Sequence, residues 1–344
     1  MFRVGLTRDF LKPDGTVGWG DIRLDLLDAA PGLEWEFLAE NTGELRADQV
    51  RDYDAVIVLA PRVTAATLEG ADRLALIARF GVGYDSVDVD ACTRNGVLLS
   101  ITPDSVRRPM ATTVLTYILA LSHRLLQKDR LTREGGWARK LDYMGYGLTG
   151  KTVGIIGLGN IGQEAVRLCA PLEMRFIAYD PYLDAAKAAS LGVESVDLET
   201  LLRTADFVVI LCQLTPETHH LLNAERIALM KPTAFLVSVA RGPIVDQVAL
   251  TTALQQGRIR GAGLDVFEQE PVDPNDPILR LDNVIVSPHA LCWTDEMASR
   301  AGVSISRSIL AVKAGQAPEH TVNRAAIDSP LVQAKLQRYR AAQP

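Results

Sequence analysis

The 344-residue chain is 48% hydrophobic and 23% charged, an ordinary globular composition, and its length suits two domains better than one. Its net charge of −6 argues against nucleic acid or an anionic membrane as a partner. The four cysteines are far apart and lack any CxxC pair, so we expect small buried hydrophobes in a reducing, cytoplasmic compartment, with neither a metal site nor a disulfide.

The first hundred residues alternate short apolar runs with helix-like stretches such as DIRLDLLDAA and VTAATLEGA. The strand candidates are RVGL, WEFLA, AVIVLA, LALIARFG and VLLSI. This alternation predicts a parallel sheet flanked by helices. One long helical pattern follows, from about Val106 to Leu131, and its most apolar part is too short to span a bilayer. A glycine-rich aromatic loop comes next and indicates a boundary.

From Lys151 the alternation begins again, and we expect Asp197 to cap one of the helices. The six strand candidates are TVGIIG, FIAYD, DFVVILC, AFLVSVA, GAGLDVF and NVIVS. Pro171 predicts a kink or an early end of the helix after the first of these strands. After Pro288 we expect one long helix, DEMASRAGVSISRSILAVKAG, and then a polar tail without strong periodicity. The two halves therefore predict two units of similar architecture that are not sequence repeats.

The strongest local signal is GLGNIG, which directly follows the strand TVGIIG and opens a helix. Gly157 permits a tight turn, Gly159 lets the backbone approach a pyrophosphate, and Gly162 allows close packing of helix and strand. The helix N-terminus then offers amide donors and a favourable dipole to phosphates. A tight turn without a ligand is the alternative, but the strand–turn–helix–strand context favours dinucleotide binding.

The next strand ends in Asp180, 18 residues after Gly162. An acid at this place accepts hydrogen bonds from the adenosine ribose and repels the 2′-phosphate of NADP. The alternative is a simple cap at the end of the strand. Because Arg175 lies before the acid and not just after it, the sequence favours NAD over NADP as the cofactor.

Three further residues stand at or beyond the ends of predicted strands, where open α/β sheets bind ligands. They are Arg241 after FLVSVA, Glu270 after GAGLDVF and His289 after NVIVSP. Each has a structural alternative: a solvated charge, a loop acid or a buried histidine. Beside a dinucleotide fold, however, a guanidinium can grip a carboxylate, an imidazole can transfer the hydroxyl proton, and a carboxylate can orient the imidazole. Together they predict hydride transfer between nicotinamide and a small 2-oxo or 2-hydroxy acid.

The blocks VGIIGLGNIG, LTPET, VSVARGPIVD, GAGLDVFEQEP and VSPH, in this order, resemble the D-isomer-specific 2-hydroxyacid dehydrogenase family, and the similarity runs from about residue 50 to 325. The resemblance implies two flavodoxin- or Rossmann-like α/β domains with parallel sheets and the active site between them. The NAD-binding domain, residues 106–291, would be inserted into a discontinuous substrate domain, residues 1–105 and 292–344. A cytoplasmic homodimer with NAD as cofactor and a small 2-oxo or 2-hydroxy acid as substrate is expected.

The resemblance also assigns roles to single residues. Arg241 would hold the substrate carboxylate, His289 would act as acid and base, and Glu270 would support His289. The loop FGVGYDSVD would add the amides of Val82 and Gly83 as substrate donors. Besides the three glycines of the turn, the cofactor contacts would be Asn160, Ile161, Asp180, Thr215, Val239, Ala240, Arg241, Asp265 and His289.

Two departures from the family pattern, Thr112 and the bulky Trp293, put the identity of the substrate in doubt. Other readings stay open on the same scaffold. Formate-specific relatives typically carry glutamine in place of the supporting glutamate, so Glu270 favours a 2-hydroxy acid over formate or phosphite. An NAD-sensing corepressor would keep much of the same residue set, and the sequence does not separate it from the enzyme.

Overall fold

The computed structural model describes residues 1–342 and divides into two compact units. Unit 1 comprises residues 1–106 together with the chain from Trp293 onward, and unit 2 comprises Arg107–Cys292. Each unit builds a parallel sheet from alternating strands and helices, so the expected α/β fold class is confirmed. Among the helices of residues 1–342, none has the length and apolar content that crossing a bilayer requires.

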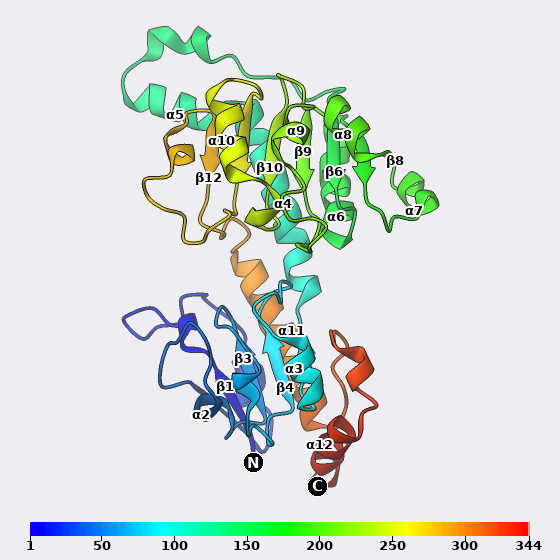
Figure 1. The fold of residues 1–344 in the computed structure, drawn as a ribbon. Helices are drawn as coiled ribbons and strands as arrows, with labels where there is room; N and C mark the ends of the chain where they lie inside the picture. Colours follow the sequence, from blue (N-terminus) through cyan, green and yellow to red (C-terminus); the bar gives the residue numbers. More distant parts are fainter. Residues whose placement is uncertain (343–344) are drawn as a thin grey trace. The chain divides into compact units, whose positions relative to one another are not determined.

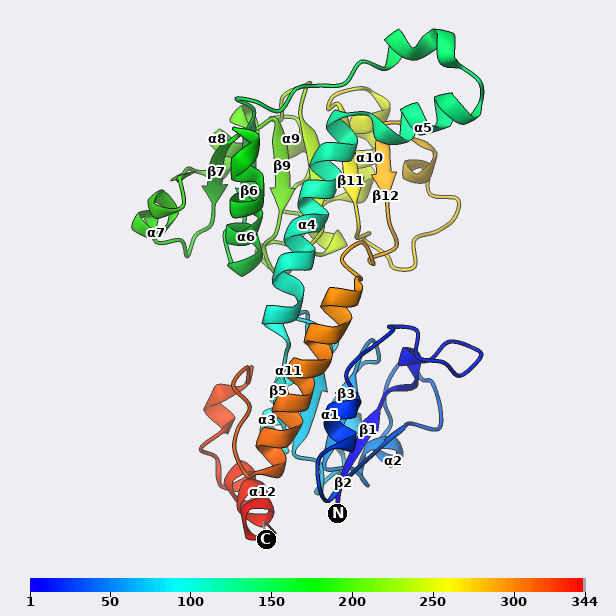
Figure 2. The ribbon, with the colours of Figure 1, turned by 180° about the vertical axis from the view of Figure 1, so that it is seen from behind.

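Within the described residues, the sheet of unit 1 has five parallel strands in the order β2-β1-β3-β4-β5. The strands are β1 (Phe2–Leu6), β2 (Leu33–Phe37), β3 (Ala55–Val58), β4 (Leu76–Arg79) and β5 (Leu98–Ser100). The helices α2 (Ala47–Val50) and α3 (Val89–Arg94) share one apolar core with the sheet. The long helix α11 (Asp295–Lys313) packs against β4, and α1 (Asp25–Asp28) lies beside it (Figure 1, Figure 2).

The sheet of unit 2 has seven parallel strands over the same range, in the order β12-β11-β10-β9-β6-β7-β8. The strands are β6 (Thr152–Ile156), β7 (Arg175–Tyr179), β8 (Val193–Ser195), β9 (Phe207–Ile210), β10 (Phe235–Ser238), β11 (Gly261–Leu264) and β12 (Val284–Val286). Five of them, β7-β6-β9-β10-β11, repeat the order of the unit 1 sheet. The expectation of similar architectures is therefore confirmed.

Two apolar cores cover the two faces of this sheet. One contains side chains of α8 (Leu198–Thr204), α9 (Ala224–Ile227) and α10 (Gln247–Gln255). The other contains side chains of α4 (Pro103–Ser122) and α6 (Asn160–Cys169), while α7 (Ala185–Ser190) lies beside β8. Because both faces are buried, the carboxyl ends of the strands remain as the place where polar side chains can meet a ligand.

The chain departs from the expected elements at four places. The first is the stretch VTAATLEGA, where only the 3₁₀ helix Ala66–Leu68 forms. The helix expected over residues 106–131 is two helices, because α4 ends at Ser122 and Arg124 adopts a left-handed φ of 52° before α5 (Leu125–Arg133). The strand β8 and the helix α12 (Pro330–Ala341), in the tail, were not predicted. In contrast, α6 ends at Cys169 before a 3₁₀ turn with Pro171, and Asp197 caps α8, both as expected.

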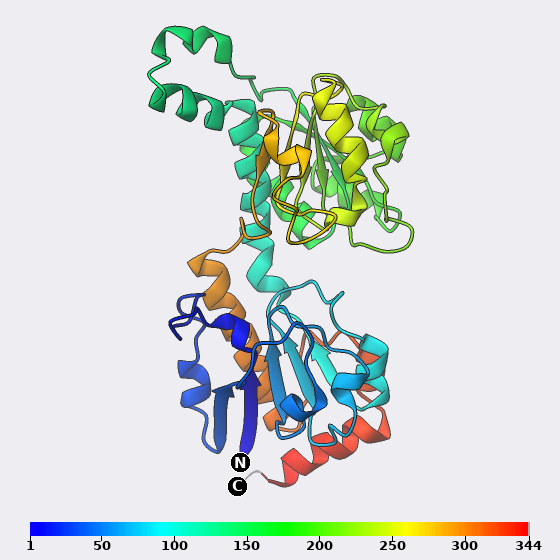
Figure 3. The same ribbon diagram turned by 60° about the vertical axis from the view of Figure 1, so that its left-hand side comes forward.

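Residues 125–144, here called the arm, contain α5 and a 3₁₀ helix, Trp137–Tyr143. Figure 3 shows the arm extending away from the rest of unit 2, and the other views agree. Five large apolar side chains of the arm are exposed: Leu125, Leu126, Trp137, Leu141 and Met144.

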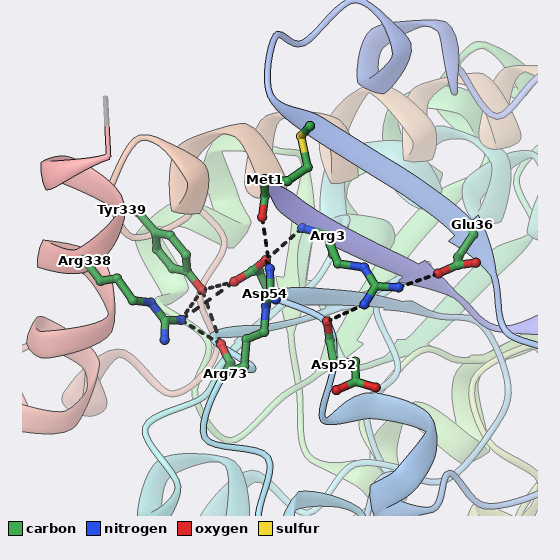
Figure 4. Close-up of polar contacts among 8 residues, drawn as sticks. All are labelled: Met1, Arg3, Glu36, Asp52, Asp54, Arg73, Arg338 and Tyr339. Atoms are coloured by element: carbon green, nitrogen blue, oxygen red, sulfur yellow. Dashed lines mark hydrogen bonds and ion pairs between the residues drawn. The ribbon is translucent and has the colours of Figure 1, made fainter. Parts of the chain in front are cut away.

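A buried carboxylate attaches α12 to the amino end of the unit 1 sheet (Figure 4). Asp54 precedes β3, and its Oδ2 accepts hydrogen bonds from the Arg3 amide at 2.7 Å and from Arg73 Nη2 at 2.6 Å. Its Oδ1 accepts from the Tyr339 hydroxyl of α12 at 2.9 Å. Both oxygens are thus satisfied, which stabilises the position of the tail helix.

Candidate functional site

The glycine turn lies at the carboxyl end of β6, and its three glycines have different surroundings. Gly157 has a φ of 93°, and a Cβ there would lie 2.6 Å from the Cys212 amide nitrogen. A Cβ at Gly162 would lie 2.8 Å from the Gly157 carbonyl oxygen, so this position requires the close packing that glycine allows. A Cβ at Gly159 would meet nothing within 4 Å. The space in front of the α6 N-terminus, where Asn160 and Ile161 begin the helix, therefore fits a phosphate group.

Asp180 follows β7 and reaches back to this turn. Its Oδ2 accepts a hydrogen bond from the Leu158 amide at 3.0 Å, and its Oδ1 accepts from the Tyr182 amide at 2.9 Å. The side chain thus caps the loop after the strand and lies beside the glycine turn. Cys212, after β9, is on the same side, and burial, aided by the charge of Asp180, raises the pKa of its thiol to about 11. This thiol therefore stays protonated and unreactive at neutral pH.

Thr215 lies in the loop that follows β9. Its amide donates to the Thr218 hydroxyl at 2.7 Å, which folds the loop LTPET into a compact turn. On the next strand, Val239 is buried after β10, and Ala240 and Arg241 are partly buried. The predicted cofactor contacts Thr215, Val239, Ala240 and Arg241 thus all follow neighbouring strands of the sheet.

Arg241 and Glu270 are brought together by a close backbone contact. A Cβ at Gly242 would overlap the carbonyl of Phe267, so glycine lets the loop after β10 lie against the loop after β11. The Arg241 Nη1 donates to the Ala240 carbonyl at 2.8 Å. The Phe267 amide donates to Glu270 Oε1 at 3.0 Å, which leaves Oε2 directed at another group.

That group is the His289 imidazole, whose Nδ1 lies 2.8 Å from Glu270 Oε2. Burial alone would raise the pKa of Glu270, but the hydrogen bonds from His289 and Phe267, with the charges of His289 and Arg241, outweigh it and lower the pKa below its ordinary value. Glu270 is therefore an ionised acceptor for Nδ1, and it leaves Nε2 of the imidazole unengaged. His289 has a left-handed φ of 53°, a strained conformation that often marks functional residues.

Asp265, the predicted partner of the nicotinamide carboxamide, is 1% exposed at the end of β11. Its Oδ1 accepts from the Ser287 hydroxyl at 2.5 Å and from the Ala290 and Leu291 amides at 3.0 and 3.1 Å. In the described part of the chain its Oδ2 is buried and has no hydrogen-bond partner. A buried carboxylate oxygen without a donor fits an amide group of a ligand, so the residues here suit the carboxamide of NAD.

The predicted substrate loop belongs to unit 1, between β4 and α3. Gly81 is fixed by a hydrogen bond from its amide to the Thr102 hydroxyl at 2.9 Å. Beside this loop, the Trp19 ring packs against Phe80 at 5.0 Å and against Trp293 at 4.3 Å between centroids. Trp293 is thus part of an aromatic cluster next to the loop.

The sequence did not single out Ser287 or the pair His220 and Glu268. His220 Nε2 lies 2.7 Å from Glu268 Oε1, which connects the loop after β9 to the loop that carries Glu270. Ser287 stands two residues before His289, and a small polar residue there, at the end of a strand, was the available signal.

The chain is similar to known proteins of one enzyme family. The family model "D-isomer specific 2-hydroxyacid dehydrogenase, NAD binding domain" matches residues 115–290. A glyoxylate reductase of Korarchaeum cryptofilum is 38% identical over 294 residues, which are 84% of this chain and 89% of the relative. A D-3-phosphoglycerate dehydrogenase of Methanocaldococcus jannaschii is 40% identical over 299 residues, 86% of this chain and 55% of the relative. The structure of D-lactate dehydrogenase from Aquifex aeolicus, complexed with NAD and lactic acid, is similar with a TM-score of 0.78 at 27% identity, covering 90% of this chain and 94% of that one.

Proposed function

The chain belongs to the D-isomer-specific 2-hydroxyacid dehydrogenase family, and from this premise we propose that it reduces glyoxylate or a similarly small 2-oxo acid with NADH. The protein is an NAD-dependent oxidoreductase. Two findings favour a small substrate: relatives of the glyoxylate reductase type cover most of the chain, and bulky indoles lie beside the proposed substrate loop. Hydroxypyruvate is the next candidate of this class.

The observation that carries the proposed mechanism is the pair of His289 Nδ1 and Glu270 Oε2 at 2.8 Å, with Arg241 on the adjoining loop. When bound, the reduced nicotinamide supplies a hydride to the carbonyl carbon of the oxo acid. The carbonyl oxygen then needs a proton, and we assign its donation to His289 Nε2. Glu270 stabilises the protonated imidazole and fixes its orientation. In the reverse direction neutral His289 accepts the hydroxyl proton.

We assign the substrate carboxylate to the Arg241 guanidinium, which can donate two parallel hydrogen bonds. The amides of Val82 and Gly83 are proposed as further donors to the same carboxylate. In this role each amide would donate to a charged carboxylate oxygen in place of water, and a hydrogen bond to a charged acceptor is the stronger of the two.

For the cofactor, we propose that the glycine turn and the first amides of α6, from Asn160 and Ile161, hold the pyrophosphate. Asp180 would accept from the adenosine ribose and reject the 2′-phosphate of NADP. Asp265 Oδ2 would accept from the carboxamide. Unit 2 would thus be the cofactor domain and unit 1 the substrate domain.

The direct test is turnover of a panel of 2-oxo acids with NADH and NADPH. We expect the largest kcat/KM for glyoxylate or hydroxypyruvate with NADH. In Asp180→Ser the ratio of NADPH to NADH efficiency should rise, because the charge that repels the 2′-phosphate is gone. Tight NADH binding without turnover of any oxo acid would contradict the enzyme and favour a sensor.

We also propose that the arm joins two copies of the chain in a homodimer. Its side chains Trp137, Leu141 and Met144 are each at least two-thirds exposed on a segment that extends from unit 2. Burying such a patch against a symmetric copy removes apolar surface from water at no cost to the core. Light scattering after gel filtration should give a dimer mass for the wild type and a monomer for Trp137→Ser combined with Leu141→Ser. An unchanged mass in the double variant would place the interface elsewhere.

A cytoplasmic location completes the proposal. It is supported by the four free cysteines, three of which are buried, since free thiols persist in reducing compartments.

A further inference from the structure

Tyr117 is a fully buried tyrosine of α4 whose role is not explained by packing alone. It is 1% exposed, and a Cβ at Gly263 of β11 would overlap its ring, so the helix lies directly on the sheet here. Its hydroxyl lies 2.6 Å from Ser287 Oγ, at the end of β12. Phenylalanine would fill the same volume without a polar group to satisfy. The polar groups around the hydroxyl should therefore explain why tyrosine and not phenylalanine stands at this position.

The direction of these hydrogen bonds follows from the acceptor at the far end. Ser287 Oγ donates to Asp265 Oδ1 at 2.5 Å, so the single serine proton points to Asp265. Ser287 is then the acceptor for Tyr117, which must donate. Burial raises the pKa of the Tyr117 hydroxyl and keeps it protonated. The result is two hydrogen bonds in series: the Tyr117 hydroxyl donates to Ser287 Oγ, and Ser287 Oγ donates to Asp265 Oδ1.

Asp265 Oδ1 also fixes the backbone on the far side of His289. It accepts from the amides of Ala290 and Leu291, the two residues that follow His289. The left-handed backbone of His289 is strained, and such a conformation persists only where neighbouring contacts hold it. The His289 amide donates to the carbonyl of Ser287, two residues earlier, at 3.1 Å. Ser287 and Asp265 together therefore hold both ends of the turn that carries the imidazole.

We propose that Tyr117 and Ser287 are positioning residues for His289. They act through Asp265, whose Oδ1 they help to place, and leave its Oδ2 available to the cofactor. This inference rests on the acid and base role of His289 in the proposed function. It adds two residues that touch neither the oxo acid nor the imidazole.

The test compares Tyr117→Phe, Ser287→Ala, their double variant and Ser287→Thr with the wild type. We expect kcat with NADH to fall roughly three- to ten-fold in Tyr117→Phe and roughly ten-fold in Ser287→Ala, as for the loss of one hydrogen bond in a network. The NADH Kd should change by less than kcat. Because Tyr117 acts only through Ser287, the double variant should lose no more than Ser287→Ala alone. Ser287→Thr keeps the hydroxyl and should restore most of the rate.

A second readout does not depend on turnover. With ¹³C-labelled histidine, the His289 ring resonance, assigned by its loss in His289→Ala, should shift in Tyr117→Phe and in Ser287→Ala. The matched control is Ser122→Ala on the same helix. The Ser122 hydroxyl donates to the Leu119 carbonyl of its own helix, so this variant should leave rate and resonance unchanged.

An unshifted resonance with wild-type kcat in both single variants would overturn the proposal, as would losses that add in the double variant. If Tyr117→Phe fails to fold, Ser287→Ala and Ser287→Thr still test the Ser287 hydroxyl through which Tyr117 acts. Wild-type kcat with an unshifted resonance in Ser287→Ala would then overturn the proposal. If the wild type reduces no 2-oxo acid, the proposed function fails, and the resonance still shows whether the chain of hydrogen bonds positions His289.

Discussion

Asp54 in unit 1 and Asp265 in unit 2 are both buried aspartates at a strand end, but they lie at opposite ends of their parallel sheets. Asp54 precedes β3, and donors from the backbone, Arg73 and Tyr339 satisfy both of its oxygens (Figure 4). Asp265 follows β11, and its three donors all bind Oδ1 while Oδ2 has none within residues 1–342. A satisfied carboxylate stabilises the fold, whereas an incompletely satisfied one is ready for a ligand.

Unit 2 has its own counterpart of Asp54. Asp206 precedes β9, which holds the place of β3 in the shared strand order, and its Oδ2 accepts from the Thr152 amide of β6 at 2.9 Å. Its Oδ1 accepts from Lys231 at 3.3 Å. The two units thus share a stabilising device at the amino ends of their strands. The incompletely satisfied carboxylate and the strained histidine occur at a carboxyl end. We therefore expect substitutions at carboxyl ends to act mainly on catalysis and those at amino ends to act mainly on stability.

The largest effect should come from His289→Ala. Loss of the proposed proton donor should lower kcat by about 10²- to 10⁴-fold, the usual contribution of general acid catalysis, while the NADH Kd changes little. Steady-state rates and a fluorescence titration with NADH measure the two quantities. The matched control is His123→Ala, an exposed histidine beyond the end of α4. Wild-type kcat in His289→Ala would show that another group supplies the proton.

Arg241→Lys should have the next largest effect. Lysine keeps the charge but loses the paired geometry, so KM for the oxo acid should rise roughly 10- to 100-fold. NADH affinity should stay close to the wild type. Arg203→Lys, on the surface of α8 where Arg203 pairs with Glu199, is the control for the substitution itself. An unaltered KM in Arg241→Lys would remove Arg241 from the carboxylate site.

Glu270→Gln should have a smaller effect, seen best in the pH dependence. The ionised carboxylate favours the protonated imidazole, so its removal should lower kcat/KM for reduction roughly ten-fold and move the alkaline limb of the pH profile to lower pH. The oxidative direction, which needs neutral His289, should extend toward acid. Glu268→Gln, the neighbouring acid that pairs with His220, is the control. A fixed alkaline limb would mean that Glu270 and His289 do not act as a pair.

The thermal stability of the protein should also depend on the charge of the Glu270 carboxylate. The folded-state pKa of Glu270 is lowered, so its contribution to stability is present above the unfolded-state pKa and is lost as the pH falls through the folded-state pKa. The difference in Tm between wild type and Glu270→Gln should therefore shrink from neutral to acidic pH.

Asp54→Asn should have the smallest effect on catalysis and a clear effect on folding. The variant loses the ion pair with Arg73 in a buried place, which should lower the free energy of unfolding by on the order of 2 kcal/mol. Calorimetry should show a lower Tm with kcat and KM unchanged. Asp52→Asn is the control, since Asp52 is exposed and contributes only its backbone carbonyl to the network in Figure 4. A loss of kcat at full stability would break the proposed division between the two sheet ends.

The sequence by itself determined the strands other than β8, the glycine turn and the family. Apolar runs specify strands that are buried on both faces. In GLGNIG, Gly157 meets a requirement for positive φ and Gly162 a requirement for close packing within the turn. The same local logic pointed to Arg241, Glu270 and His289 at strand ends, where the structure brings Glu270 and His289 into contact. Their catalytic roles, like the substrate role of Val82 and Gly83, stay predictions.

Only the tertiary structure decided how the polar groups are satisfied. Tyr117 and Ser287 are 170 residues apart, and Tyr339 reaches Asp54 across 285 residues, so no local pattern could pair them. The helix α12 was missed for the same reason, because its buried residues Val332, Leu336 and Tyr339 pack against elements that are distant in the sequence, as Tyr339 does against Phe2. The break at Arg124 depends on a left-handed backbone that hydrophobic periodicity does not indicate. Periodicity encodes which side of an element is buried, but a hydrogen bond between distant residues depends on the packing that places them side by side.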